Sequence, residues 1–185
     1  MRAESSGPAG VKIVNDPVPG PFRDSVKIGE QDLLQSARDL VGDRDLRAHE
    51  FTLQLRAFDV SRRGASLGLS ALLSLCSALL GKSLKGGLVS VGALNLGATL
   101  DLVYNADSFA ERAVEKGAQT LLIPISARRQ LNDLSDDMAT KIAIPYYADA
   151  QEALLKALGS KGGDRQHERA VTPCFDRCEI DPGSD

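Results

Sequence analysis

Residues 64–81 read GASLGLSALLSLCSALLG, a serine between two glycines that opens an almost wholly apolar run. The polar residues of the run fall on one line of a helix, at spacings of four, four and three: Ser66, Ser70, Ser74 and Ser77. A helix that is apolar on its remaining sides is buried nearly all round. Gly81 supplies the usual left-handed stop. The stretch therefore predicts a central buried helix, around which the rest of the chain packs.

Ser66 stands at the mouth of this helix, and two interpretations of it remain open. Serine is among the best N-cap residues, because its oxygen accepts a hydrogen bond from an otherwise unpaired backbone amide. A turn bracketed by Gly64 and Gly68 can also present a serine hydroxyl as a nucleophile, provided that a base lies within reach. Local sequence alone favours the cap.

Composition indicates one domain with an aliphatic core. The 185 residues are 43% hydrophobic, whereas aromatic residues make up 4% and tryptophan is absent. The net charge of −3 gives no general reason to expect nucleic acid. Two arginine pairs, Arg62-Arg63 and Arg128-Arg129, are either solvated side chains or local DNA contacts.

The apolar runs, the first residues and the cysteines together predict a cytoplasmic protein without a membrane-spanning segment. Its apolar runs are too short to span a bilayer, and the first residues lack the apolar core of a signal peptide. Three cysteines fit a reducing compartment, with Cys76 placed as a small buried hydrophobe.

Periodicity predicts alternating helices and strands. Residues 1–25 are rich in Pro and Gly and are expected to form an extended lead-in or linker. A helix is expected at 31–41, with Leu33, Leu34, Ala37, Leu40 and Val41 on one face and Gly42 at its end, and a half-buried strand at 51–60. Further strands are expected at 87–91, 119–124 and 142–146, the last at a sheet edge because of Pro145. Further helices are expected at 106–114, 126–134 and 150–158, the last capped by Asp149 and Glu152.

Interleaved helices and strands without a strict repeat favour the α/β class. We expect a single compact mixed α/β domain over residues 26–158, a mixed sheet with helices packed on it. Residues 159–185 are polar and without periodicity, and are expected to be a disordered tail.

Three short motifs are weak site candidates. Leu80-Gly81-Lys82-Ser83 ends like a phosphate-binding loop, but Cys76 stands where that loop needs a glycine and a helix precedes it in place of a strand. His167, Cys174 and Cys178 offer too few ligands for a metal site, so no metal or cofactor is expected in this domain. His49 is best interpreted as a surface histidine at a strand end.

Three stretches of the chain together resemble the proteolytic domain of the Lon protease family: 64–68 (GASLG), 92–97 (GALNLG) and 115–124 (EKGAQTLLIP). The resemblance covers roughly residues 25–159 and implies a Lon-type fold. It implies that Ser66 occupies the position of the nucleophilic serine, whose family turn reads Gly-Pro-Ser-Ala-Gly. The family's partner lysine lies at the start of the following helix, in a Gly-Gly-Leu-Lys segment.

Counted without a gap from Gly92 to Pro124, that lysine segment falls on residues 104–107, so Asp107 stands at the lysine position. The amino end of a helix favours the anionic form of an aspartate and makes it a poor base. Lys116 lies about two and a half turns further along the same helix, too far to replace the lysine. The resemblance therefore implies a vestigial Ser66 and a domain that is inactive as a protease.

Residues 103–106 (VYNA) and 126–141 (SARRQLNDLSDDMATK) are similar to the carboxy-terminal part of the Lon-like protein of bacteriophage-exclusion (BREX) defence systems. Members of that family carry an ATPase module ahead of the Lon-like domain, form rings and associate with DNA. The resemblance implies a role in assembly, as a homo-oligomeric ring or with an AAA+ partner, with ATP bound only by a module outside this chain. The chain would then be a fragment, a split gene product or a truncated relative. The alternative is a working ATP-dependent Lon-type serine endopeptidase that uses Ser66 with another base, such as Lys82, Lys85 or His49.

Overall fold

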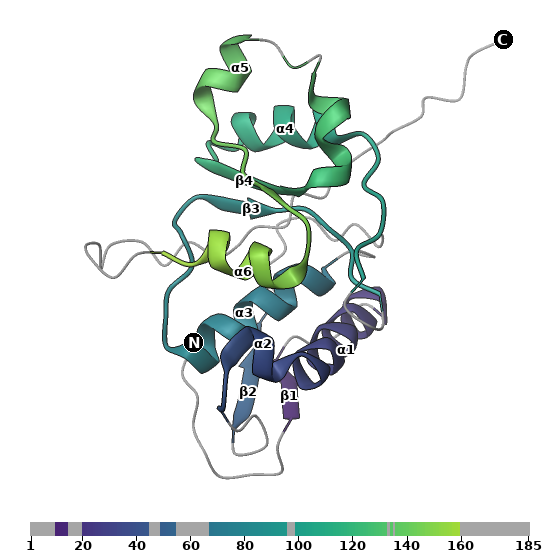
Figure 1. Cartoon of the computed structure of the whole chain (residues 1–185), viewed down its shortest axis with the longest axis vertical. Helices are drawn as coiled ribbons and strands as arrows, with labels where there is room; N and C mark the ends of the chain where they lie inside the picture. The colour runs from purple at the N-terminus through teal and green to yellow at the C-terminus, as the bar shows by residue number, and fades with distance from the viewer. Residues whose placement is uncertain are drawn as a thin grey trace, which may run out of the picture.

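A computed structural model of the chain describes residues 10–14, 20–44, 49–54, 67–95, 99–132, 134 and 136–159. Within these ranges helices and short strands interleave along the chain. The expected mixed α/β class is thus confirmed. Figure 1 shows α1, α3, β1 and β2 at one end of the molecule, α4 and α5 at the other, and α6 between them.

Helix α3 (Gly68–Leu80) is the predicted central helix, and it is buried as its sequence requires. Six of its large or apolar side chains are at most 5% exposed: Leu69, Leu72, Leu73, Leu75, Cys76 and Leu79. The helix ends at Gly81 in the left-handed conformation (φ 61°), and the Gly81 amide donates to the Ala78 carbonyl. Leu67 occupies the N-cap position, and Ser66 lies outside the described residues.

The serines of α3 are satisfied by neighbouring groups of the protein. The Ser70 and Ser90 hydroxyl oxygens lie 2.9 Å apart, which ties the helix to a buried strand. Ser74 donates to the carbonyl of Ser70 at 2.8 Å, and Ser77 donates to that of Lys82 at 2.6 Å. A nearly buried helix can carry this polar line because each hydroxyl has a partner.

The described strands form two small parallel sheets. In the first, β1 (Gly10–Ile13) pairs with β2 (Glu50–Leu53). In the second the order is β3 (Leu88–Ser90), β4 (Thr120–Pro124), β5 (Tyr146–Tyr147). Antiparallel pairing occurs among the described residues as isolated bridges, at Leu84–Leu158 and Leu94–Leu100. The expected single mixed sheet is therefore corrected to two parallel ones. The edge position expected for the strand after Pro145 is confirmed.

The structure corrects the extended lead-in predicted for residues 1–25. Within that range β1 is a paired strand, and α1 (Gly20–Gln35) already begins at Gly20. Pro21 is tolerated because the first amides of a helix have no partner inside it. Phe22 is 4% exposed and packs in a cluster with Leu53, so tertiary burial outweighs the Pro and Gly composition.

The helix predicted at 31–41 is divided in the structure. The end of α1 and the short α2 (Ala37–Val41) meet at Ser36, and Gly42 follows α2 with φ 72°, as expected for its stop. Leu34 was expected on the buried face but is 51% exposed, because the buried face of α1 runs through Val26, Gly29 and Leu33, and Leu34 lies beside it. Leu33, Leu40 and Val41 are buried as predicted.

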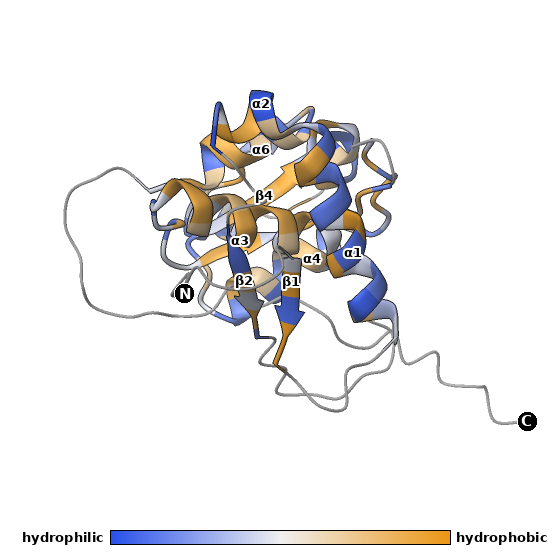
Figure 2. Ribbon diagram, turned by 90° about the horizontal axis from the view of Figure 1, so that it is seen from below, coloured by the Kyte–Doolittle hydropathy of each residue, from blue (hydrophilic) through white to orange (hydrophobic). Residues whose placement is uncertain are grey.

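The second sheet carries helices on both faces. Helix α4 (Ala106–Glu115) and the 3-10 helix η2 (Ile125–Leu131) share one core cluster with Val89, Leu121 and Ile123. On the other face α3 and α6 (Ala150–Ala157) share a cluster with Leu88 and Leu122. The alternation of β4 side chains between the two clusters explains why this strand is buried from Leu121 to Pro124. Figure 2 shows α3 and β4 largely in hydrophobic colours, whereas the outer side of α1 is hydrophilic.

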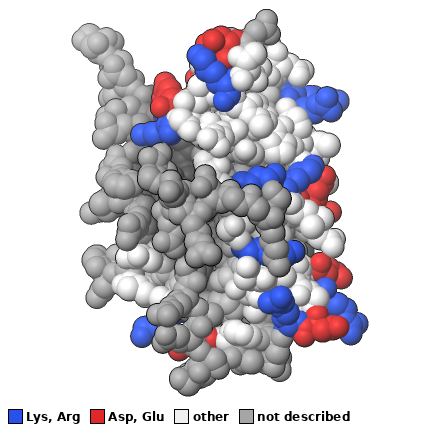
Figure 3. Space-filling model, turned by 90° about the vertical axis from the view of Figure 1, so that its left-hand side faces the viewer, with Lys and Arg blue, Asp and Glu red and all other residues white. Residues whose placement is uncertain are grey.

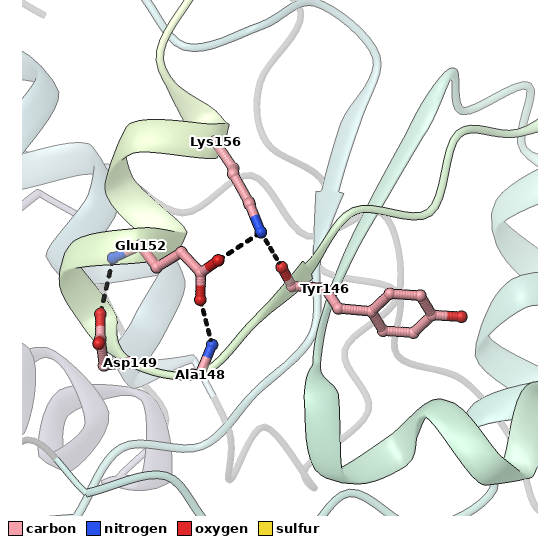
Figure 4. Close-up of polar contacts among 5 residues, drawn as sticks. All are labelled: Tyr146, Ala148, Asp149, Glu152 and Lys156. Atoms are coloured by element: carbon pink, nitrogen blue, oxygen red, sulfur yellow. Dashed lines mark hydrogen bonds and ion pairs between the residues drawn. The ribbon is translucent and has the colours of Figure 1, made fainter.

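The helix expected from Ser126 to Leu134 is corrected to the 3-10 helix η2, which begins at Ile125 after Pro124. A separate short helix, α5 (Asp136–Lys141), follows it. The capping box of α6 is confirmed: Asp149 accepts from the Glu152 amide at 2.7 Å, and Glu152 accepts from the Ala148 amide at 2.7 Å (Figure 4). Two hydrogen bonds lower the pKa of the Glu152 carboxyl. The larger effect comes from the Lys156 side chain, and the next from the Ala148 amide. Within the described residues, each helix is too short or too polar to cross a bilayer.

The contact between α1 and α3 gives a direct stability prediction. A Cβ added at Gly29 would lie 3.0 Å from the Gly68 carbonyl oxygen and 3.2 Å from the Leu72 amide nitrogen. Gly29→Ala should therefore lower the free energy of unfolding by about 1–3 kcal/mol, the usual range for overpacking, as measured by urea denaturation. Gly20→Ala in the same helix is the matched control, because a Cβ there meets nothing within 4 Å. Equal stability of the two variants would contradict the close approach.

Candidate functional site at the start of α4

Asp107, which the Lon resemblance equates with the family's lysine, lies in the first turn of α4 with its side chain exposed. The preceding Asn105 adopts the left-handed conformation (φ 57°) and makes no side-chain cap to the helix. Asparagine is one of the few residues other than glycine that adopts this conformation readily. The turn into α4 is thus sharply defined, and it presents Asp107 to solvent.

The start of α4 is held by Gln130, which comes from η2. Its side-chain nitrogen donates to the Val103 carbonyl at 2.7 Å, and its side-chain oxygen accepts from the Ala106 amide at 3.0 Å. Ala106 is fully buried, so its amide needs a partner within the protein. A residue distant in sequence therefore performs the capping that Asn105 does not.

A hairpin-like connection links this site to the amino end of α3. The Asp101 amide donates to the Ala93 carbonyl at 3.0 Å, next to the bridge between Leu94 and Leu100. A Cβ added at Gly68 would touch the Leu94 side chain at 3.4 Å. The start of α3 and the connection that leads to α4 therefore pack together.

The alternative bases lie elsewhere. Lys82 and Lys85 follow the carboxyl end of α3, whose 13 residues span about 20 Å from the Leu67 end. Lys116 is the C-cap of α4, at the far end of that helix from Asp107. His49 precedes β2 and stacks on Phe51, with 6.2 Å between ring centroids. The structure therefore places Asn105, Asp107 and the hydrogen bonds of Gln130 at the start of α4, and it places Lys82, Lys85 and Lys116 at or beyond the carboxyl ends of α3 and α4.

The remaining sequence candidates give no assembled site. After α3 the chain turns at Gly81 and leads to β3, so Lys82 and Ser83 precede a strand and not the helix of a phosphate-binding loop. Ser66, Arg62, Arg63, His167, Cys174 and Cys178 lie outside the described residues. Across the part of the chain that the structure describes, His, Cys, Asp and Glu form no group of three that could hold a metal.

Arg128 and Arg129 are exposed on η2, and the Arg128 guanidinium lies 5.7 Å from the centroid of the Tyr146 ring. A cation over an aromatic face is a weak attraction that fixes the orientation of the arginine. The face drawn in Figure 3 carries Lys and Arg interspersed with Asp and Glu, without a broad basic area among its described residues. This face gives no extended phosphate-binding surface.

Sequence reasoning missed Gln130 and the conformation of Asn105. Both residues belong to the segments on which the resemblance to the BREX Lon-like protein was based, 103–106 and 126–141. The Gln130 hydrogen bonds join these two segments directly. The presence of both segments in one chain indicated that they belong to one site. The contact of Gln130 with Val103 and Ala106 depends on the tertiary fold.

Two curated proteins named "Lon-like protease BrxL" are similar to this chain. The protein of Escherichia coli O9:H4 (strain HS) is 29% identical over 111 residues, which is 60% of this chain and 16% of that protein. The protein of Bacillus cereus (strain H3081.97) is 27% identical over 93 residues, 50% of this chain and 14% of that protein. The matched region thus spans less than a fifth of either relative. No family model matches the chain. The expected closeness to the Lon-like proteins of this type is confirmed.

Removing the Gln130 side chain should loosen the start of α4. Gln130→Ala leaves the buried Ala106 amide without its acceptor, which typically costs about 1–3 kcal/mol. We expect faster hydrogen exchange at Ala106 and a lower urea midpoint. Gln151→Ala is the matched control, because it removes an exposed hydrogen bond to the Asp39 carbonyl. Unchanged exchange at Ala106 would show that Gln130 does not hold this turn.

Cys76 is expected to be chemically inert in the folded protein. Burial raises the pKa of its thiol to about 12, and the side chain is fully buried. The thiolate is the reactive form, so it is scarce at neutral or mildly alkaline pH. In a Cys174→Ser/Cys178→Ser variant, a disulfide reagent at pH 8 should label no thiol until urea unfolds the chain. Rapid labelling of the folded variant would contradict the placement of Cys76.

Proposed function

We propose that this chain is a Lon-like domain of a BREX-type phage-defence protein, which acts in ring assembly and not in proteolysis. The observation that carries the proposal is Asp107 in the first turn of α4, in a chain similar to two Lon-like BrxL proteins. The proposal retains the Lon-type fold that the sequence resemblance implies.

The chemistry of this position supports a non-proteolytic role. A serine nucleophile needs a neighbouring group that accepts its proton. A carboxylate is a weaker base than the neutral amine that a lysine would supply at this position. Lys82, Lys85 and Lys116 lie at the far ends of α3 and α4. We therefore assign Ser66 as a vestigial nucleophile.

The larger assembly is part of the same proposal. The matched region is 16% and 14% of the two relatives, so ATP would be bound by a module outside it. The chain would join a homo-oligomeric ring or an AAA+ ATPase partner in the cytoplasm. Contact with DNA would come through the complex.

A working ATP-dependent Lon-type serine endopeptidase is the second candidate. It is favoured by one observation, the glycine-bracketed turn at 64–68, which still places a serine at the nucleophile position. This candidate requires a base that is supplied by another segment or another subunit.

A serine-directed fluorophosphonate separates the two candidates. We expect no labelling of the purified chain, and no hydrolysis of unfolded casein beyond that of Ser66→Ala, while an active Lon protease reacts under the same conditions. Asp107→Lys is the informative variant, because labelling gained only in this protein would show that the missing lysine accounts for the inactivity. Labelling or hydrolysis by the unmodified chain that disappears in Ser66→Ala would overturn the proposal.

A further inference from the structure

Large apolar side chains are exposed beside the candidate site. Leu102 is 66% exposed and Tyr104 is 72% exposed, while Val103 between them packs against the second core cluster. This alternation is that of an extended segment with one face on the core. Ile125, the first residue of η2, is 54% exposed. Exposed aromatic and aliphatic side chains of this kind are typical anchors of protein interfaces.

The segment that carries Leu102 and Tyr104 is held in place before any partner arrives. Its Asp101 amide donates to the Ala93 carbonyl, and Gln130 donates to the Val103 carbonyl. A surface that is already ordered loses less conformational entropy on binding than a mobile loop does. The two exposed side chains therefore form a prepared contact.

Acidic side chains line one face of α4 and basic side chains lie on η2, while Arg112 and the C-cap residue Lys116 also belong to the α4 segment. Asp107, Glu111 and Glu115 are exposed on α4 at spacings of four, so they form one acidic stripe. Arg128 and Arg129 are exposed on η2, where Arg128 lies three residues after Ile125 and on the same side of a 3-10 helix. Within the described part of the chain, these five charged side chains form no ion pair. Like charges four residues apart weaken a helix, so the stripe does not serve the stability of the isolated chain.

We infer that a second copy of this chain docks here, with the acidic surface of one copy against the basic surface of the other. The acidic surface consists of Leu102, Tyr104, Asp107, Glu111 and Glu115, and the basic surface consists of Ile125, Arg128 and Arg129. Each surface combines exposed apolar side chains with charges of one sign, so the two are complementary to each other. This inference rests on the assembly role proposed above and names the surfaces that carry it.

In the proposed contact, Asp107 has a role in binding. A lysine at this position would interrupt the acidic stripe and repel Arg128 and Arg129 of the neighbouring copy. An aspartate extends the stripe to the start of α4, next to the Tyr104 segment. The residue that removes the base is thus also a residue that favours the contact.

Charge reversal tests the contact on the full chain. Analytical ultracentrifugation should show self-association that weakens about tenfold or more in Arg128→Glu/Arg129→Glu and in Glu111→Arg/Glu115→Arg. An equimolar mixture of the two variants should recover association, because the acidic surface of the first variant and the basic surface of the second are both unmodified and can pair. Tyr104→Ser should also weaken association. Lys82→Glu/Lys85→Glu and Leu155→Ser are matched controls, since all three residues are exposed away from α4 and η2.

Each outcome is decisive. Association that survives both reversals overturns these surfaces and leaves the assembly role intact. A wild-type chain that stays monomeric overturns the docking of a second copy, and leaves an AAA+ partner as the form of the proposed assembly role. Loss of association without recovery in the mixture contradicts the pairing of the two surfaces. Unchanged association, together with DNA retention that is lost in Arg128→Glu/Arg129→Glu, would assign the arginines to nucleic acid instead.

Discussion

The close packing of α1 on α3 is the contact on which the rest of the structure depends. Helix α3 is apolar on nearly every side, so it must be covered by other elements, and α1 approaches so closely that Gly29 has no room for a side chain. The first sheet, the second sheet and α6 cover its remaining sides. Because α3 is held from all directions, its amino end at Leu67 and the neighbouring Leu94 connection have a defined position relative to the second sheet.

A second constraint shapes the other end of the molecule, where one glutamine replaces a local helix cap. Gln130 satisfies a buried amide of α4 and a carbonyl of the connection before it, so η2 and the start of α4 form a unit. Tyr147 makes a comparable link near the sheet, since its hydroxyl donates to the Val91 carbonyl at 2.7 Å and would collide with any Cβ at Gly92. Burial raises the pKa of this phenol, which therefore stays a hydrogen-bond donor. Both links use side chains whose partners are remote in sequence.

This difference between local and remote partners decides what could be predicted from the sequence. The end of α3 at Gly81, the end of α4 before Gly117 and the Asp149 cap of α6 depend on residues within one or two turns, and they are confirmed. Strand β1 and the first turns of α1 become ordered through contacts with β2 and α3, so their local composition was misleading. The same holds for the site: Asp107 was identified by its position in the chain, whereas Gln130 acquires its role only when η2 packs beside α4.

The exchange of a lysine for an aspartate changes more than the presence of a base. A lysine at the amino end of a helix is disfavoured by the helix dipole, and that tension is what makes it a useful base in a Lon-type site. An aspartate at the same place is favoured by the dipole, so the substitution removes the tension together with the catalytic group. A neutral amine at this position would have to be shielded from water, whereas a carboxylate does not. Asp107 is exposed. An exposed carboxylate aligned with Glu111 and Glu115 repels its neighbours in the isolated chain, and positive charge from a partner would relieve that repulsion. Under the proposed function, the same exchange would remove the catalytic base and leave a surface that favours a basic partner.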